Sequence, residues 1–305
     1  MPKKAFLGRV SDVDLRLLRV FRSVVACGGV SAAELELNIG RSTISRHLTD
    51  LEVRLGVKLC ERGPAGFALT SEGKRVLSAS SRLLSALNAF QSEVDDVHQR
   101  LAGHLSIALF DKTITNPEAR LPQSITLFDE IAPKVTIEIH AEPVNVIESG
   151  VITGRFQVGI IPIHGQSNSM NYYPIYSEQM YLYCGESHEL FDRAGGKIPR
   201  RAIQQCKYAG IGFHSPNMTV SHKLKLKRSA DAYDEEVLAA LILSGRYIGF
   251  LPDHYAKSLV DRGEMRRLRP DVYHYQSNHA AIVRRSPKPS RLISEFVECL
   301  RRALN

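Results

Sequence analysis

The stretch that most constrains the fold of this chain is SAAELELNIGRSTISRHLTDLEVRLGVKLCER, at residues 31–62. Ser31 and Glu34 have the spacing of a capping box, which predicts a short helix from Ala32 to about Leu37. Asn38–Gly40 predicts a turn, because Asn and Gly tolerate backbone conformations that other residues resist. A second helix should follow, because its apolar residues are spaced to form one buried stripe: Ile44, Leu48, Leu51 and Leu55.

The other face of this second helix is polar and basic near its start. Such a helix fits the major groove of B-DNA, where Arg reaches guanine and Ser or Thr reaches bases or phosphates. The alternative is an ordinary helical hairpin with a solvated polar face, because helix-turn-helix patterns are short and degenerate. The candidate DNA-binding residues of the two helices are Ser31, Arg41, Ser42, Thr43, Ser45, Arg46 and His47.

The segments on either side of this hairpin complete a small domain. Before it, Ser11 and Asp14 have capping-box spacing and predict the start of a third helix. After it, GVKLCERGPAGFAL predicts two short strands around Gly63–Gly66. Lys58 and Arg62 then lie where such a hairpin, or wing, meets the phosphate backbone or the minor groove. Solvated surface charge is the alternative for both residues.

The order of residues in this region resembles the N-terminal domain of the LysR-type transcriptional regulators. The resemblance rests on AAELELNIGRSTISRHLTDLEVRLGVKL, followed by CER and LTSEG. Two positions depart from it, since the family usually has Phe where Cys60 stands and often Gln where Arg41 stands. The resemblance implies a winged helix-turn-helix domain that binds double-stranded DNA as a homodimer or homotetramer, with RNA polymerase as a further candidate partner.

A long helix from Thr70 or Ser71 to about Arg100 should link this domain to the rest of the chain. Its apolar residues recur at the a and d positions of a heptad, which suits side-by-side pairing of two chains. Packing against its own chain is the alternative. The residues of this heptad seam are Leu83, Leu87, Phe90, Val94, Val97 and Leu101.

Strands and helices alternate from His104 onward, and the first five elements read βαβαβ, which implies a parallel sheet. The segment YPIYSEQMYLYCGESHEL predicts an edge strand and a turn. This part resembles the effector domain of the same family, a two-lobed fold like that of periplasmic binding proteins, although Gln157 stands where the family commonly has Asp. The fold expected is therefore α+β and multidomain. Its expected divisions are a winged helix-turn-helix domain at 9–70, a dimerisation helix at 71–102 and a two-lobed α/β effector domain at 103–305, with lobe I at about 103–162 and 279–305 and lobe II at about 163–278.

Open α/β sheets bind ligands beyond the carboxyl ends of their strands. The residues expected at that place, which also match family effector sites, are Phe110, Lys112, Thr113, Pro162, Phe213, His214 and Asn217. Lys112 is the one evident cation among them and suggests a small organic anion as effector, the alternative being an exposed lysine. A pocket closed by the loop Lys112–Pro122 and left empty is the competing expectation.

Composition is ordinary for a soluble globular protein and excludes little by itself. The net charge of +8 and the pI of about 9.3 suit an anionic partner, and five scattered cysteines without CxxC spacing suggest a reducing cytoplasm. No apolar run reaches the length of a membrane span, and no catalytic, metal-binding or cofactor motif stands out. We therefore expect a cytoplasmic, non-enzymatic, sequence-specific regulator controlled by a small molecule between the lobes. A constitutive DNA-binding regulator is the alternative.

Overall fold

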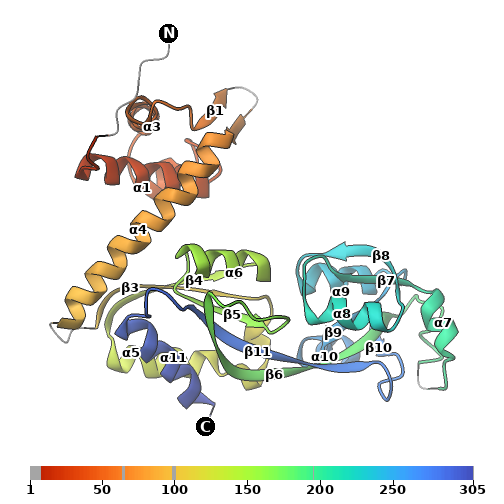
Figure 1. The fold of residues 1–305 in the computed structure, drawn as a ribbon. Helices are drawn as coiled ribbons and strands as arrows, with labels where there is room; N and C mark the ends of the chain where they lie inside the picture. Colours follow the sequence, from red (N-terminus) through yellow and green to blue (C-terminus); the bar gives the residue numbers. More distant parts are fainter. Residues whose placement is uncertain (1–7, 64–65, 98–100, 195, 305) are drawn as a thin grey trace. The chain divides into compact units, whose positions relative to one another are not determined.

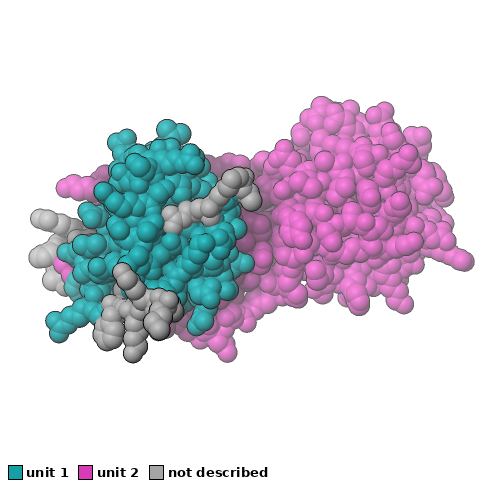
Figure 2. All heavy atoms as spheres, turned by 90° about the horizontal axis from the view of Figure 1, so that it is seen from above, with its two compact units in different colours: residues 1–90 teal, residues 91–305 magenta. Residues whose placement is uncertain are grey.

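The computed structural model describes residues 8–63, 66–97, 101–194 and 196–304. The chain divides into two compact units, residues 1–90 and 91–305, which Figure 2 colours separately. Each unit has hydrophobic core clusters of its own.

Unit 1 contains three helices, a two-stranded hairpin and the first part of a long helix (Figure 1). Its core is made of side chains from all three short helices and the hairpin. The apolar stripe predicted for the second helix of the pair is confirmed, since Ile44, Leu48 and Leu51 are fully buried. The elements are α1 Asp12–Ala26, α2 Ala33–Leu37, α3 Arg41–Leu55, β1 Cys60–Gly63, β2 Gly66–Leu69 and α4 Ser71–Val97.

The two predicted capping boxes have different outcomes. At α1 the prediction is confirmed, because the Ser11 amide and hydroxyl both donate to Asp14 Oδ2, at 2.8 and 2.6 Å. At α2 the prediction is wrong, because α2 begins at Ala33 after an Ala32 cap that makes no side-chain hydrogen bond. Glu34 Oε1 instead accepts the Arg41 amide at 2.6 Å, so this carboxylate satisfies a free N–H group at the start of α3.

The LTSEG motif joins the hairpin to α4 through a close backbone approach. Thr70 Oγ1 lies 2.7 Å from the Lys58 carbonyl oxygen and accepts the Gly73 amide at 2.9 Å. A Cβ atom on Gly73 would stand 1.9 Å from the Leu59 carbonyl oxygen. Glycine is therefore required at this position, because no side chain fits between α4 and the backbone of Leu59, just before β1.

Unit 2 is built on a nine-stranded sheet with the order β4-β3-β5-β11-β6-β9-β7-β8, and β10 pairs with β6 beside this row. The strands are β3 Ala102–Leu109, β4 Lys134–Ala141, β5 Val158–Pro162, β6 Met170–Gly185, β7 Lys207–Ile211, β8 Lys227–Ala232, β9 Ile248–Pro252, β10 Met265–Arg267 and β11 His274–Arg284. The α-helices are α5 Leu121–Ile131, α6 Val144–Thr153, α7 Arg200–Gln205, α8 Pro216–Lys223, α9 Glu235–Leu243, α10 Asp253–Asp261 and α11 Arg291–Ala303.

The parallel start predicted for this sheet is confirmed, because β3 pairs in parallel with both β4 and β5. The edge strand predicted around Glu178 is wrong. That segment belongs to β6, which lies inside the sheet between β11 and β9. Short-range alternation in the sequence marks a strand but says nothing about neighbours that come from distant parts of the chain.

Two lobes can be distinguished by the elements that cover the sheet (Figure 1). We call lobe I the part around β3, β4 and β5 with α5, α6 and α11, and lobe II the part around β7, β8 and β9 with α7 to α10. The long strands β6 and β11 run through both lobes and pair from Met170 with Arg284 to Tyr181 with His274. Their register shifts once, between His279 and Ala280. The lobe and domain bounds given above stay predictions.

Candidate functional site

The polar face of α3 is the first candidate site. Arg41, Ser42 and Arg46 are exposed on it, while the buried stripe holds the opposite face of the helix to unit 1. The backbone start of α3 is fixed by the bond between Glu34 and Arg41. A short helix held in this way presents its N-terminal side chains to a partner with little loss of backbone freedom.

The other predicted DNA-binding residues differ in their surroundings. Ser31 is exposed, and Thr43, Ser45 and His47 are partly buried. His47 Nδ1 is buried without a hydrogen-bond partner among the described atoms. Lys58 Nζ lies 2.8 Å from Glu61 Oε2 on the exposed hairpin, and the side chain of Arg62 lies outside the described residues.

An ion pair fixes α3 against α1. Arg54 Nε and Nη2 donate to the two carboxylate oxygens of Asp14 at 2.5 and 2.9 Å, and Asp14 is 2% exposed. The bonds from Arg54 and then from Ser11 hold the pKa of Asp14 well below its usual range. Asp14, which completes the capping box of α1, therefore also holds α3 in position.

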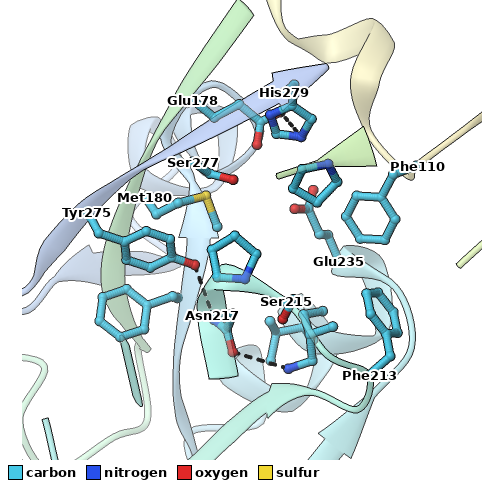
Figure 3. Close-up of a pocket in the computed structure, with 15 residues that line it drawn as sticks. Phe110, Glu178, Met180, Phe213, Ser215, Asn217, Glu235, Tyr275, Ser277 and His279 are labelled. Atoms are coloured by element: carbon cyan, nitrogen blue, oxygen red, sulfur yellow. Dashed lines mark hydrogen bonds and ion pairs between the residues drawn. The ribbon is translucent and has the colours of Figure 1, made fainter. Parts of the chain in front are cut away.

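The second candidate site is a pocket between the lobes of unit 2, with about 390 Å³ of space that protein atoms do not fill, part of it open to solvent. Four of the seven predicted effector residues line it: Phe110, Pro162, Phe213 and Asn217. Lys112, Thr113 and His214 do not. The polar residues that line it are Glu178, Ser215, Asn217, Glu235, Tyr275, Ser277 and His279 (Figure 3).

The predicted cation has another role. Lys112 Nζ lies 2.9 Å from Glu236 Oε2 and 3.5 Å from Asp111 Oδ1. Asp111 Oδ2 in turn accepts the Glu235 amide at 2.9 Å, and Thr115 Oγ1 lies 2.9 Å from His254 Nδ1. The loop after β3 in lobe I thus contacts lobe II through side chains that were expected to face a ligand.

Thr113 and His214 also lie away from the pocket lining. The Thr113 hydroxyl is buried and donates to the Phe110 carbonyl at 2.7 Å. His214 is exposed, with its ring 5.1 Å from that of His164. Asn217, by contrast, belongs to a buried network, because its Oδ1 accepts the Tyr208 hydroxyl at 2.8 Å and the Ile211 amide at 3.4 Å.

Two buried glutamates on the pocket wall were missed by the sequence reasoning. Glu178, on β6, is 6% exposed, and Glu235, the first residue of α9, is 5% exposed. Burial first, and then the charges of Glu178 and Asp111, raise the pKa of Glu235 well above its usual range. Among the described residues that line the pocket there is no Lys or Arg. An anion therefore has no fixed positive charge to meet there.

Histidines accompany Glu178. Its Oε1 lies 3.3 Å from His254 Nε2 and 3.8 Å from His279 Nε2, although neither geometry is that of a hydrogen bond. The ring of His279 stacks on Tyr176 with centroids 4.6 Å apart. Burial lowers the pKa of His279, so its ring is neutral near pH 7 and offers no fixed positive charge to the pocket.

The cysteines of unit 2 are free and buried. Burial raises the pKa of Cys184 to about 12 and that of Cys206 to about 11. Such thiols are poor nucleophiles near neutral pH. Among the described residues, no cluster of side chains could hold a metal ion, and none of the helices is long and apolar enough to cross a membrane.

Comparisons with known proteins match two parts of the chain to two family domains. Residues 98–305 match the LysR substrate binding domain, and residues 15–74 match the bacterial regulatory helix-turn-helix protein, lysR family. The chain is 40% identical over 294 residues to the HTH-type transcriptional activator BauR of Pseudomonas aeruginosa, covering 96% of each. It is 32% identical to the probable HTH-type transcriptional regulator LrrA of Synechococcus elongatus, covering 79% of this chain and 81% of that relative.

Solved structures share the fold. The crystal structure of CbnR, a LysR family transcriptional regulator, matches with a TM-score of 0.65 at 20% identity and covers 95% of this chain and 99% of CbnR. Full-length CbnR complexed with its target DNA matches with a TM-score of 0.62 at 21% identity over the same shares. The matched relatives and both matched domains agree, and the chain belongs to the LysR family of transcriptional regulators.

Proposed function

We propose that this regulator binds specific double-stranded DNA through α3 and responds to a small molecule held in the pocket between the lobes. The observation that supports the response most directly is the pocket lining, where buried polar atoms of Ser215, Glu235 and His279 have no hydrogen-bond partner among the described atoms. Buried polar groups normally find partners, so a pocket that leaves several unpaired is suited to a ligand that completes them. No catalytic step belongs to this function.

The DNA-binding part of the proposal rests on the face of α3. Arg41 and Arg46 are exposed and flank Ser42, which gives two guanidinium groups and a hydroxyl on one short helix. An Arg that reads a base contributes to discrimination, whereas an Arg on a phosphate strengthens binding to all sequences alike. Lys58 and the hairpin would then contact the backbone beside this helix.

A homodimer, alone or within a tetramer, would supply the two-fold symmetry that a palindromic operator requires. The helix α4 supports this, because Phe90 and Val94 of the heptad seam are 63% and 41% exposed. Large apolar side chains repeated along one helix and open to solvent suit a second copy of that helix. We propose that this regulator acts on DNA in the cytoplasm.

Mapping of bound sites across the genome, followed by footprinting on the strongest site, tests the DNA-binding part. Arg41→Ala and Arg46→Ala should each weaken operator binding by about 1–3 kcal/mol. Arg82→Ala, an exposed position on α4, is the matched control and should bind as the parent does. If both α3 variants bind operator DNA and random DNA as the parent does, α3 is excluded as the helix that reads the sequence.

The response is tested on the same operator with small molecules suggested by the genes beside it. A ligand that changes the footprint should lose that effect in Phe213→Ala, because the Phe213 ring lines the pocket. It packs edge-on against the ring of Phe110, with ring centroids 5.7 Å apart. A footprint that no such molecule changes would identify a constitutive regulator.

A further inference from the structure

The charge of the pocket indicates which class of molecule it takes. Glu178 enters the lining from β6 and Glu235 from the start of α9. Figure 3 shows the Glu235 carboxylate directed toward the side of the pocket that Glu178, Ser277 and His279 line. Two carboxyl groups thus approach one small space from different elements, and the described lining contains no Lys or Arg to balance them.

The lysine nearest in sequence to the pocket residues is paired elsewhere. Lys112 pairs with Glu236 and Asp111 and does not line the pocket. Glu235 Oε2 is buried and has no hydrogen-bond partner among the described atoms. Ionisation of a buried carboxyl group without a partner is costly, and a cation placed against the ionised form offsets that cost.

Two further groups, neither of them acidic, point to a ligand in the same place. Ser215 Oγ and His279 Nδ1 belong to side chains that are 4% and 3% exposed, both line the pocket, and both lack a partner among the described atoms. Ser215 precedes α8 without capping it through its side chain. A hydroxyl and a neutral imidazole can each donate to or accept from a polar ligand.

We propose that the pocket binds a small organic molecule through a protonated amine, which Glu178 and Glu235 hold from opposite sides. The aliphatic part of the molecule packs against Phe110, Phe213 and Met180, which line the remaining wall. This inference rests on the proposed function of the pocket as the effector site. It replaces the small organic anion that Lys112 suggested in the sequence.

Binding of an ammonium group beside Glu235 should release a proton from the protein, which an uncharged ligand should not do. The groups that act on Glu235 are Glu178 from β6, Asp111 and Lys112 from the loop after β3, and Asp234 beside it; His279 and Tyr275 of β11 line the same pocket. Burial and the neighbouring acids raise the pKa of Glu235, and an ammonium group placed against the carboxyl group should lower that pKa again. At a pH below this raised pKa, the carboxyl group ionises when the ammonium group binds, and its proton passes to solvent while the amine keeps its own. Affinity should therefore rise with pH below the raised pKa of Glu235, level off above it, and fall once the amine loses its proton, near pH 10 for an ordinary alkylamine.

Calorimetry on the full chain with three probes of equal length tests the charge preference. The probes are n-propylamine, propionate and 1-propanol, which share a three-carbon chain and differ in charge. The amine should bind, and the other two should bind at least about tenfold more weakly, as loss of one charge-assisted hydrogen bond implies. Repeating the amine titration in HEPES and in phosphate, which differ in ionisation enthalpy, should show a proton released on binding at a pH below the raised pKa of Glu235.

Near-isosteric variants assign the two carboxyl groups. Glu178→Gln and Glu235→Gln should each weaken amine binding by about 10- to 100-fold. Glu235→Gln should also abolish the proton release, which a merely structural role would leave unchanged. Glu236→Gln is the matched control, because Glu236 adjoins Glu235 in the chain, is 76% exposed and lies outside the pocket. Its affinity and proton release should equal those of the parent.

The outcomes separate the ligand class from the existence of the site. Propionate binding that exceeds amine binding and disappears in Phe213→Ala would overturn the amine and leave the effector pocket in place. Absence of binding by all three probes would overturn the amine proposal and count against the pocket as an effector site. Equal amine affinity in the two pocket variants and the control would overturn the assignment of Glu178 and Glu235.

Discussion

Removing the ion pair between Asp14 and Arg54 should loosen α3 from α1 without unfolding unit 2. The Asp14 carboxylate is 2% exposed and accepts both bonds from Arg54 as well as two from Ser11, while the Arg54 side chain is 42% exposed. The substitutions that test this are Arg54→Met, which keeps the length of the side chain, Asp14→Ala, and the two together.

The expected cost follows from these contacts. Hydrogen bonds to a charged group contribute about 1.5–3 kcal/mol when buried, and exposure of the guanidinium reduces this, so Arg54→Met should cost about 2 kcal/mol. Asp14→Ala also loses the cap, which adds about 1 kcal/mol, for a total near 3 kcal/mol. The double variant should cost about the same as Asp14→Ala alone, which makes the coupling between the two residues about 2 kcal/mol.

Hydrogen exchange measured by mass spectrometry on the full chain is the suitable assay, with peptides from 12–26 and 41–55 reporting the free energy of local opening. Intrinsic fluorescence serves as the control, because the chain has no Trp and all eleven Tyr lie between Tyr172 and Tyr275. It should not change in any of the three variants. A coupling below about 0.5 kcal/mol would refute the role given to this ion pair.

The pH dependence of this contribution has a definite sign. Since the pKa of Asp14 is lowered in the folded state, the contribution is fully present above the unfolded-state pKa of about 3.9 and is lost as pH falls through the folded-state value. The free energies of opening of α1 and α3, obtained after correction for the intrinsic exchange rate at each pH, should therefore show no loss of this stabilisation between pH 5 and 8.

Two further variants and one reactivity measurement test other parts of the molecule. Gly73→Ala should destabilise unit 1 by more than about 2 kcal/mol, because a Cβ there would stand 1.9 Å from the Leu59 carbonyl oxygen, and exchange in 12–26 would detect it. Leu87→Asp together with Val94→Asp should weaken dimerisation at least about tenfold in sedimentation equilibrium, since unpaired charges disfavour an apolar contact; an unchanged dimer would remove the heptad seam from consideration. Buried Cys184 should react with a thiol reagent far more slowly in the folded chain than in urea, because its pKa is raised to about 12, and equal rates would contradict that burial.

The helices of unit 1 could be predicted because each depends on contacts within a few residues. The spacing of Ile44, Leu48 and Leu51 requires a helix with one buried face, and no distant residue alters that requirement. The Ser31–Glu34 cap failed because the spacing does not reveal a competing donor. The Arg41 amide takes the Glu34 carboxylate, and only the path of the turn between α2 and α3 brings the two together.

The pocket was predictable in one part only. Phe110 and Phe213 follow the ends of β3 and β7, and Pro162 is the last residue of β5, so chain order alone places them at a common edge. Glu178 and Glu235 could not be found in this way. Glu178 is an ordinary polar residue within an alternating strand, and Glu235 looks like a favourable acid in the first turn of a helix. Their burial depends on β6 lying inside the sheet and on the loop after β3 covering α9, which are contacts between distant segments.

The paired strands β6 and β11 determine what kind of motion a ligand can produce in unit 2. Because they are continuous through both lobes, lobe closure on a free hinge would have to break their ladder, whereas torsion along it would not. Torsion should be easiest at the shift in register between His279 and Ala280, since a local irregularity increases twist and leaves fewer paired groups to resist it. His279 lines the pocket. A molecule bound against His279 would therefore contact the paired strands at this irregularity, and we expect it to act on their twist there.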